Sequence, residues 1–347
     1  MSLLTVVIRR SKFMSIFHFH QSNQKYLSLL KRSIISLSVI IFCMAFSAGA
    51  WANITISYNF NGSWNDDQKA AMNNAASHFS NLFGSYFSNS GIITLDATAY
   101  NSENENLLAS AGSSVVHNGS GTFGYGEVIR NILQNGTDLN GAAAADGAVN
   151  VNFYYFTELD YNDPVPSGTY DFYSTLYHEF THALGFSSLI DEYGNPMFGN
   201  WGDGTGEWAA YDKFLVDING SRIVGDDYIL DGDLWDDASA DGSSMYFNGA
   251  NAVAANGGDL VHLYSPAIWE GGSSISHLDD DTYSDQLLML AYADDGENAR
   301  DYSALEIGML ADLGYTAVPI PGAFILMLSG LTGIGGLRRL FFRHCAK

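Results

Sequence analysis

The chain has 347 residues, 47% of them hydrophobic and 14% aromatic, which is enough for the core of one large domain or two coupled subdomains. Its net charge is −23, and all 38 acidic residues lie between residues 53 and 316, with only five of the 15 basic ones. Such a surface repels nucleic acid and anionic membranes, so no nucleic-acid partner is expected. Cys43 and Cys345 lie outside this acidic region, which excludes a disulfide-stabilised scaffold.

The first 52 residues are predicted to be a signal peptide. They contain six basic residues and no acidic one, and the apolar run from Ile34 to Phe46 is short for a membrane span. Ala50-Trp51-Ala52 has the small-x-small pattern of a signal peptidase site, which places cleavage before Asn53. The protein is therefore expected to be exported.

Strand and helix patterns interleave between residues 54 and 156. Alternating apolar residues predict strands, and apolar residues at helical spacing predict helices. The expected strands cover residues 54–60, 91–99, 113–117 and 148–156, and the expected helices cover residues 67–83 and 127–133. Asn65 and Asp66 can cap the first of these helices.

The segment from Asp171 to Leu184 predicts a helix that can hold a metal ion. It contains His178-Glu179-x-x-His182, and residues four apart share a helix face, so both imidazoles can bind one ion. Glu179 lies beside the ion, where it can take a proton from a metal-bound water molecule. One catalytic zinc ion suits this site, because it accepts imidazole ligands and lowers the pKa of bound water to about 7. Gly185 follows as the predicted helix cap.

Residues 187–275 differ in character from the region before them. Gly, Asp, Asn and aromatic residues dominate and few segments are periodic, so irregular structure is expected. Asp-Gly clusters at residues 201–206 and 231–233 can supply ligands to a structural calcium ion, although such runs are usually solvated loops. A final helix is expected at residues 303–313. The predicted fold class is α+β, with a mixed twisted sheet and two long helices in the N-terminal subdomain and a loop-rich C-terminal subdomain.

Two histidines leave a zinc ion short of one protein ligand. The metzincin metalloproteases extend the motif to His-Glu-x-x-His-x-x-Gly-x-x-His, and this chain is similar to that pattern through the glycine but has Ser188 at the third histidine position. The remaining downstream histidines of the acidic region are His262 and His277. A carboxylate such as Glu192 or Glu207 can also complete a zinc site.

The order of further motifs resembles the leishmanolysin-like branch of the metzincins, in which a long insertion precedes the third histidine. The resemblance covers roughly residues 145–316 and depends on these segments: Tyr211-Asp212-Lys213-Phe214-Leu215, Ser273-Ser274-Ile275-Ser276-His277-Leu278-Asp279, Leu288-Met289 and Gly308-Met309-Leu310-Ala311-Asp312-Leu313-Gly314-Tyr315. It implies a metzincin-like zinc protease fold, with His277 as the third zinc ligand and Met289 in the methionine turn beneath the metal.

Two other residues are candidates for supporting roles in the same site. Asp279 can orient a ligand histidine through a hydrogen bond. Tyr292 lies three residues after Met289, and the resemblance to metzincins implies that it can stabilise the oxyanion.

The expected function of residues 53–316 is that of a secreted or surface zinc metalloendopeptidase acting on proteins or peptides. Glu179 activates the zinc-bound water as general base and then delivers the proton to the departing amine. The competing hypothesis is a non-catalytic surface or matrix binding protein that keeps the fold and the metal. Glu179 argues against it, since a site that only binds a metal needs no base.

The C-terminal end is predicted to direct sorting. Residues 317–322 form a proline-containing linker, and residues 323–347 contain an apolar transmembrane segment followed by Arg338-Arg339. This arrangement resembles the PEP-CTERM sorting tail of Gram-negative bacteria, with Ile320 in place of the usual Glu. The resemblance implies export and sorting machinery as partners, transient membrane association through the tail, and a location at the cell surface or in the extracellular matrix. If the tail is not removed, it acts as an anchor.

Overall fold

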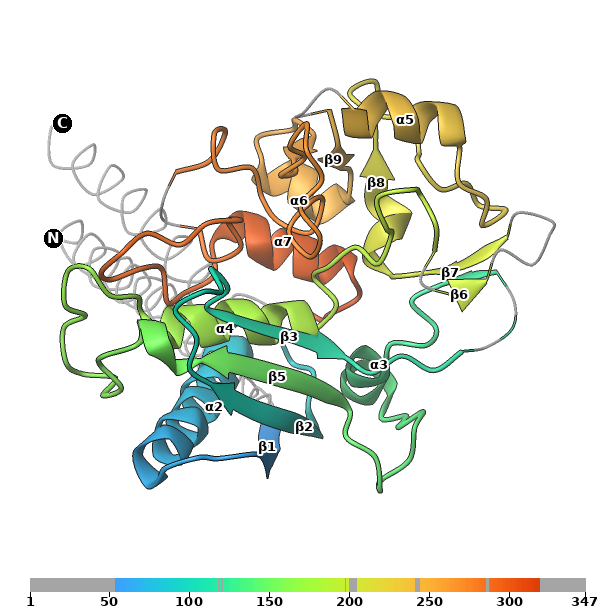
Figure 1. Cartoon of the computed structure of the whole chain (residues 1–347). Helices are drawn as coiled ribbons and strands as arrows, with labels where there is room; N and C mark the ends of the chain where they lie inside the picture. The colour runs from blue at the N-terminus through green and yellow to red at the C-terminus, as the bar shows by residue number, and fades with distance from the viewer. Residues whose placement is uncertain are drawn as a thin grey trace, which may run out of the picture. The chain divides into compact units, whose positions relative to one another are not determined.

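The computed structural model describes residues 54–318, except residues 118, 120, 197, 200–204, 241–243 and 285–286. The predicted signal peptide and the predicted sorting segment lie outside the described residues. Within the described part of the chain, no helix is both long enough and apolar enough to cross a membrane. The fold is mixed α+β, as the interleaved sequence patterns predict (Figure 1).

A four-stranded mixed sheet forms the first half of the fold (Figure 1). Its strands are β1 (Ile54–Asn61), β2 (Gly91–Tyr100), β5 (Gly147–Asn152) and β3 (Ala109–Ser113), in this spatial order. β1, β2 and β5 run parallel, whereas β3 is antiparallel to β5 and forms an edge. Alternate apolar residues are buried on one face of the sheet: Ile54, Ile56, Ile93, Leu95, Ala97, Ala109, Val149 and Val151.

Two helices pack against this sheet and against each other. α2 (Asp66–Tyr86) contacts β1, and α4 (Phe172–Ala183) contacts the edge strand β3. Phe79 of α2 lies between the two helices, with its ring centroid 5.9 Å from that of Tyr177 and 5.2 Å from that of Phe180. These aromatic contacts place α4, the predicted metal-binding helix, beside the sheet edge.

The remaining elements are short, and several of the strands pair with one another in small sheets. They are β4 (Thr122–Phe123), α3 (Val128–Asn135), the 3-10 helices η1 (Phe153–Tyr155) and η2 (Tyr211–Phe214), β6 (Phe198–Gly199), β7 (Gly206–Trp208), β8 (Leu215–Val216), α5 (Gly232–Ala240), β9 (Tyr246–Phe247), α6 (Ala250–Ala255), β10 (Val261–His262) and α7 (Ala304–Asp312). One three-stranded sheet has the order β10-β9-β8 and another the order β4-β7-β6. α7 is the predicted final helix, and it packs against α6.

The sequence prediction is wrong in the placement of two strands. β3 lies earlier than the strand expected at residues 113–117, because Val115 pairs with the residue that caps α3 rather than with β5. The strand expected at residues 148–156 ends at Asn152, whose side-chain oxygen accepts the backbone N–H of Tyr154 and begins η1. Neither segment continues the sheet ladder. A backbone bridge replaces it at Val115, and a side-chain hydrogen bond replaces it at Asn152.

Candidate metal centre

α4 carries two of the predicted metal ligands, and a buried carboxylate determines where this helix begins. The side chain of Asp171 caps the helix by accepting the backbone N–H groups of Tyr173 and Ser174. The guanidinium of Arg300, from the segment before α7, donates to the same carboxylate at 2.7 Å. The start of the helix is therefore tied to the C-terminal part of the fold.

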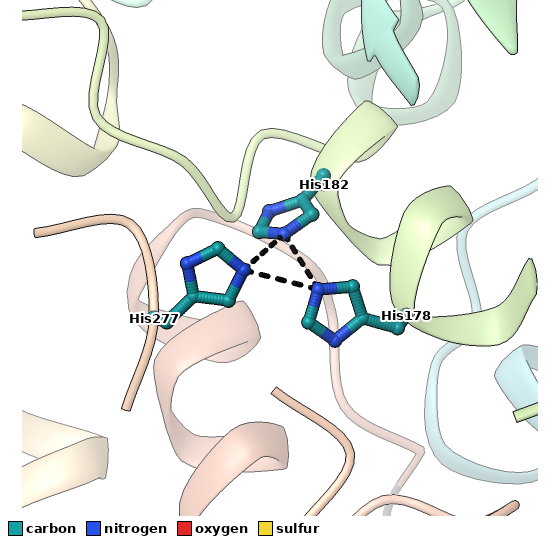
Figure 2. Close-up of side chains that lie close together, drawn as sticks. All are labelled: His178, His182 and His277. Atoms are coloured by element: carbon teal, nitrogen blue, oxygen red, sulfur yellow. Dashed lines mark hydrogen bonds between the residues drawn. The ribbon is translucent and has the colours of Figure 1, made fainter. Parts of the chain in front are cut away.

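The structure brings together the three histidines that the sequence analysis selected. His178 and His182 lie one turn apart on α4, and the ring of His277 approaches them from a loop that is distant in sequence (Figure 2). The Nε2 atoms are 2.9 Å apart for His178 and His182, 3.1 Å for His178 and His277, and 3.0 Å for His182 and His277.

Each of the three rings points its other nitrogen, Nδ1, at a backbone carbonyl. The Nδ1 to oxygen distance is 2.7 Å from His178 to Leu288, 2.6 Å from His182 to Phe186, and 2.8 Å from His277 to Ser273. A carbonyl oxygen can only accept, so each Nδ1 carries the proton of a neutral imidazole. Each Nε2 atom is then an acceptor without a hydrogen.

Three acceptor nitrogens this close together repel one another unless a cation lies among them. Burial lowers the pKa of His178 to about 4 and that of His277 to about 3, so both rings are neutral at pH 7. Burial also lowers the pKa of His182, with the neighbouring histidines adding to the effect. One metal ion at roughly 2.0–2.1 Å can reach all three nitrogens. An all-imidazole set suits zinc, copper, iron and nickel alike.

Glu179 follows His178 on α4 and is buried. Burial raises the pKa of its carboxyl group to about 8, while a hydrogen bond from the backbone N–H of Ala111 acts in the opposite direction. The charge of a cation at the three nitrogens would favour the carboxylate form of Glu179. A carboxyl group whose pKa lies near neutral pH suits general-base chemistry.

The edge strand β3 pairs with a strand on one side only, and an N–H on its other side reaches Glu179. The ladder between β3 and β5 continues beyond both ends of β3. The carbonyl of Leu108 accepts an N–H of β5, and the N–H of Ser114 donates to the carbonyl of the residue before β5. In an antiparallel ladder the groups of alternate residues, here Ala109 and Ala111, therefore point away from β5. The Ala111 N–H points away from β5 and toward the Glu179 carboxyl group. The sheet edge and the metal centre are thus neighbours.

Met289, the residue assigned to a methionine turn, is fully buried. Its backbone N–H donates to the carboxylate of Glu306 at 2.7 Å, and Glu306 is also part of the capping box of α7. The preceding carbonyl, that of Leu288, accepts the Nδ1–H of His178. Glu306 therefore anchors the turn that orients His178. This carboxylate was not identified from the sequence, although its Ser-x-x-Glu capping pattern with Ser303 was present.

Gly185 follows Leu184, the C-cap residue of α4, and its backbone φ is +99°. A Cβ atom at this position would lie 3.1 Å from the Oε1 atom of Glu127 and 3.7 Å from the side chain of Arg130. Its N–H bonds to the carbonyl of His182. Both the positive φ and the close approach of Glu127 favour glycine here, as expected for the predicted helix cap.

We expect Gly185→Ala to lower the free energy of unfolding by about 1–3 kcal/mol, because an alanine is strained at this φ and meets Glu127. Gly220→Ala is the matched control, since Gly220 has φ +79° but no atom within 4 Å of the point where a Cβ would lie. Urea denaturation of both variants checks the prediction. Equal losses of unfolding free energy in the two variants would show that Glu127 moves aside at no cost. An unchanged unfolding free energy in Gly185→Ala would contradict the strain argument.

The other candidate ligands lie away from the three histidines. His262 is in β10, and its ring packs edge-on against Tyr246 at a centroid distance of 4.4 Å. Glu207 pairs with His117, with 2.8 Å between the nearest oxygen and nitrogen, and Glu192 is exposed. Among the described residues, the three histidines form the only group of three or more His, Cys, Asp or Glu side chains close enough to share one ion.

The two candidates for supporting roles have other partners. Asp279 accepts the backbone N–H and the hydroxyl of Thr282, so the carbonyl of Ser273 takes the orienting role that was assigned to Asp279. The hydroxyl of Tyr292 contacts the Tyr264 hydroxyl at 2.7 Å and the carboxylate of Glu270. Of the two segments considered for calcium, residues 201–204 lie outside the described residues. In the other segment, Asp231 accepts a backbone N–H near the start of α5.

Comparison of the chain with protein-family models, with curated proteins and with solved structures found no match in any of the three.

Proposed function

We propose that this protein is a zinc metalloendopeptidase with a metzincin-like fold of the leishmanolysin-like branch. The observation that carries the proposal is the arrangement of three Nε2 atoms without hydrogens, with the buried Glu179 on the same helix as two of the histidines. The sequence order of His-Glu-x-x-His, a distant histidine and a methionine turn supports it.

The residues of the centre have distinct roles in this proposal. His178, His182 and His277 hold Zn2+, which when bound supplies a Lewis acid for the scissile carbonyl and lowers the pKa of a water molecule. Glu179 accepts a proton from the attacking water and transfers it to the nitrogen of the departing amine. The N–H of Ala111 keeps the Glu179 side chain in place during both transfers.

A peptide substrate fits the free side of β3 by strand addition. The backbone groups of Ala109 and the carbonyl of Ala111 point away from β5, and an extended chain can pair with them. This pairing would fix the direction of the substrate backbone and bring one peptide bond next to Glu179. Backbone recognition of this kind accepts many sequences, which is consistent with an endopeptidase.

The proposal includes export and surface placement. Residues 1–52 would direct export, and residues 323–347 would engage a sorting enzyme at the membrane. The catalytic domain would then act on proteins outside the cell, at the surface or in the matrix. The acidic composition of residues 53–316 favours solubility in that setting.

Metal removal tests the proposal directly. We expect the purified protein to cleave casein, to lose this activity after dialysis against a chelator, and to regain it with one equivalent of Zn2+ per chain. Cleavage that survives complete metal removal would contradict the proposal. A protein that binds one zinc ion and cleaves neither casein nor gelatin would support the alternative of a non-catalytic binding protein. Zinc-dependent hydrolysis of a non-peptide ester without any proteolysis would place the site in another hydrolase class.

A further inference from the structure

The loop that carries His277 contains a strained residue two positions before it. Ile275 has a backbone φ of 57°, in the left-handed region that β-branched residues rarely adopt. Its side chain is buried, and its N–H donates to the carbonyl of Tyr264. Such a backbone persists only where the surrounding contacts hold it. The position of the His277 ring therefore depends on what fixes this loop.

Ser276, between the strained residue and the ligand, makes the contacts that can fix the loop. Its Oγ atom accepts the backbone N–H of Ser188 at 3.1 Å and lies 3.4 Å from the carbonyl of the same residue, to which it donates. The hydroxyl of Ser187 lies 3.3 Å away and donates to it as well. Ser276 is 3% exposed, so water does not compete for these bonds.

The segment that Ser276 contacts is itself part of the metal centre. Phe186, directly before it, accepts the Nδ1–H of His182 through its carbonyl and donates its own N–H to Thr181 in α4. On the other side, the Ser188 hydroxyl lies near the fully buried carboxyl group of Asp212. The backbone that follows α4 is therefore held to that helix at the point where Ser276 meets it.

We infer that Ser276 is a positioning residue for the metal centre: its hydroxyl locks the loop of His277 onto the Ser187–Ser188 segment and so aims the third imidazole at the other two. The inference rests on the metal centre of the proposed function. Ser276 touches neither the metal site nor the substrate, and it acts through the backbone that carries His277. The bond links residues 88 positions apart in sequence and joins the two halves of the ligand set.

Ser276→Ala tests this role through metal affinity. We expect the affinity for Zn2+, measured by competition with a chromophoric chelator, to fall by about tenfold, at the lower end of the 10–100-fold typical for groups that orient ligands. In the Co2+-loaded protein we expect the visible absorption band of the tetrahedral ion to weaken or shift. Ser276→Thr keeps a hydroxyl at the same place, and it should restore most of the affinity.

Ser274→Ala is the matched control. Ser274 lies in the same loop and is also 3% exposed, but its Oγ accepts the N–H of Glu270 and does not reach the segment after α4. Both alanine variants lose one buried hydroxyl, so both should lower the urea midpoint of the metal-free protein. Only Ser276→Ala should also change Zn2+ affinity and the Co2+ spectrum.

The outcomes separate this inference from the proposed function. Wild-type affinity and spectrum in Ser276→Ala, or equal losses in the Ser274→Ala control, would overturn the positioning role. A wild-type protein that binds Zn2+ with the expected Ser276 dependence but cleaves no peptide would overturn the proposed function alone. A wild-type protein that binds no Zn2+ would overturn both.

Discussion

Replacing His277 with alanine is expected to abolish stable metal binding. The ring supplies one of the three Nε2 atoms, and without it only the two nitrogens of α4 remain. The loss of affinity should exceed the roughly 10–100-fold that follows when only an orienting group is removed. Zinc content after dialysis, measured by atomic absorption, should fall from about one ion per chain to near zero. Peptidase activity should fall with it.

His262→Ala is the matched control for this experiment. Both residues belong to the loop-rich second half of the chain, and both were candidates for the third ligand. His262, however, packs its ring against Tyr246 in β10. Its removal should leave one zinc ion per chain, although the lost ring contact will lower stability. Release of zinc from His262→Ala but not from His277→Ala would show that the ligand set is wrong.

The sequence predicted the site residues of α4 more directly than it predicted the histidine that is distant in sequence. His178, Glu179 and His182 follow from helical spacing, which is a property of neighbouring residues. The approach of His277 is a tertiary contact, and spacing alone left His262 and two glutamates as alternatives. Only the resemblance to a family in which the third histidine is distant favoured His277. The structure brings this residue to the other two.

The groups that orient the ligands could not be predicted for a related reason. The three imidazoles donate to the carbonyls of Leu288, Phe186 and Ser273, and every residue type carries a carbonyl. A sequence therefore contains no signal for this role. Asp279 was selected because a carboxylate is the more recognisable partner, yet it bonds to Thr282.

The fold shows the same difference between local and distant information. Asn65, a predicted cap, is the N-cap of α2, and Ser303 is the N-cap of α7, since capping depends on residues within one turn. The edge strand β3 was misplaced because its ends are set by pairing with β5 and by the turn toward α3. α5 was missed because it lies in a segment rich in Asp and Gly, and α6 was missed because its six residues are too few to show a period.

Replacing Glu179 with glutamine is expected to lower the rate of casein cleavage by roughly 10²–10⁴-fold, the contribution typical of a positioned general base. The amide has nearly the shape of the carboxylic acid, and its oxygen can still accept the N–H of Ala111. It cannot take a proton from water at neutral pH. The zinc content should stay at one ion per chain, because Glu179 is not one of the three ligands.

The same substitution should not destabilise the metal-free protein. Burial raises the pKa of Glu179, which means that the ionised carboxyl group is unfavourable in the folded state. A neutral amide removes that cost, so the urea midpoint at pH 8 should be unchanged or higher. Loss of activity with intact metal and intact stability would assign the effect to proton transfer. Equal activity in wild type and Glu179→Gln would remove Glu179 from the mechanism, because a base that can be replaced by an amide takes no proton.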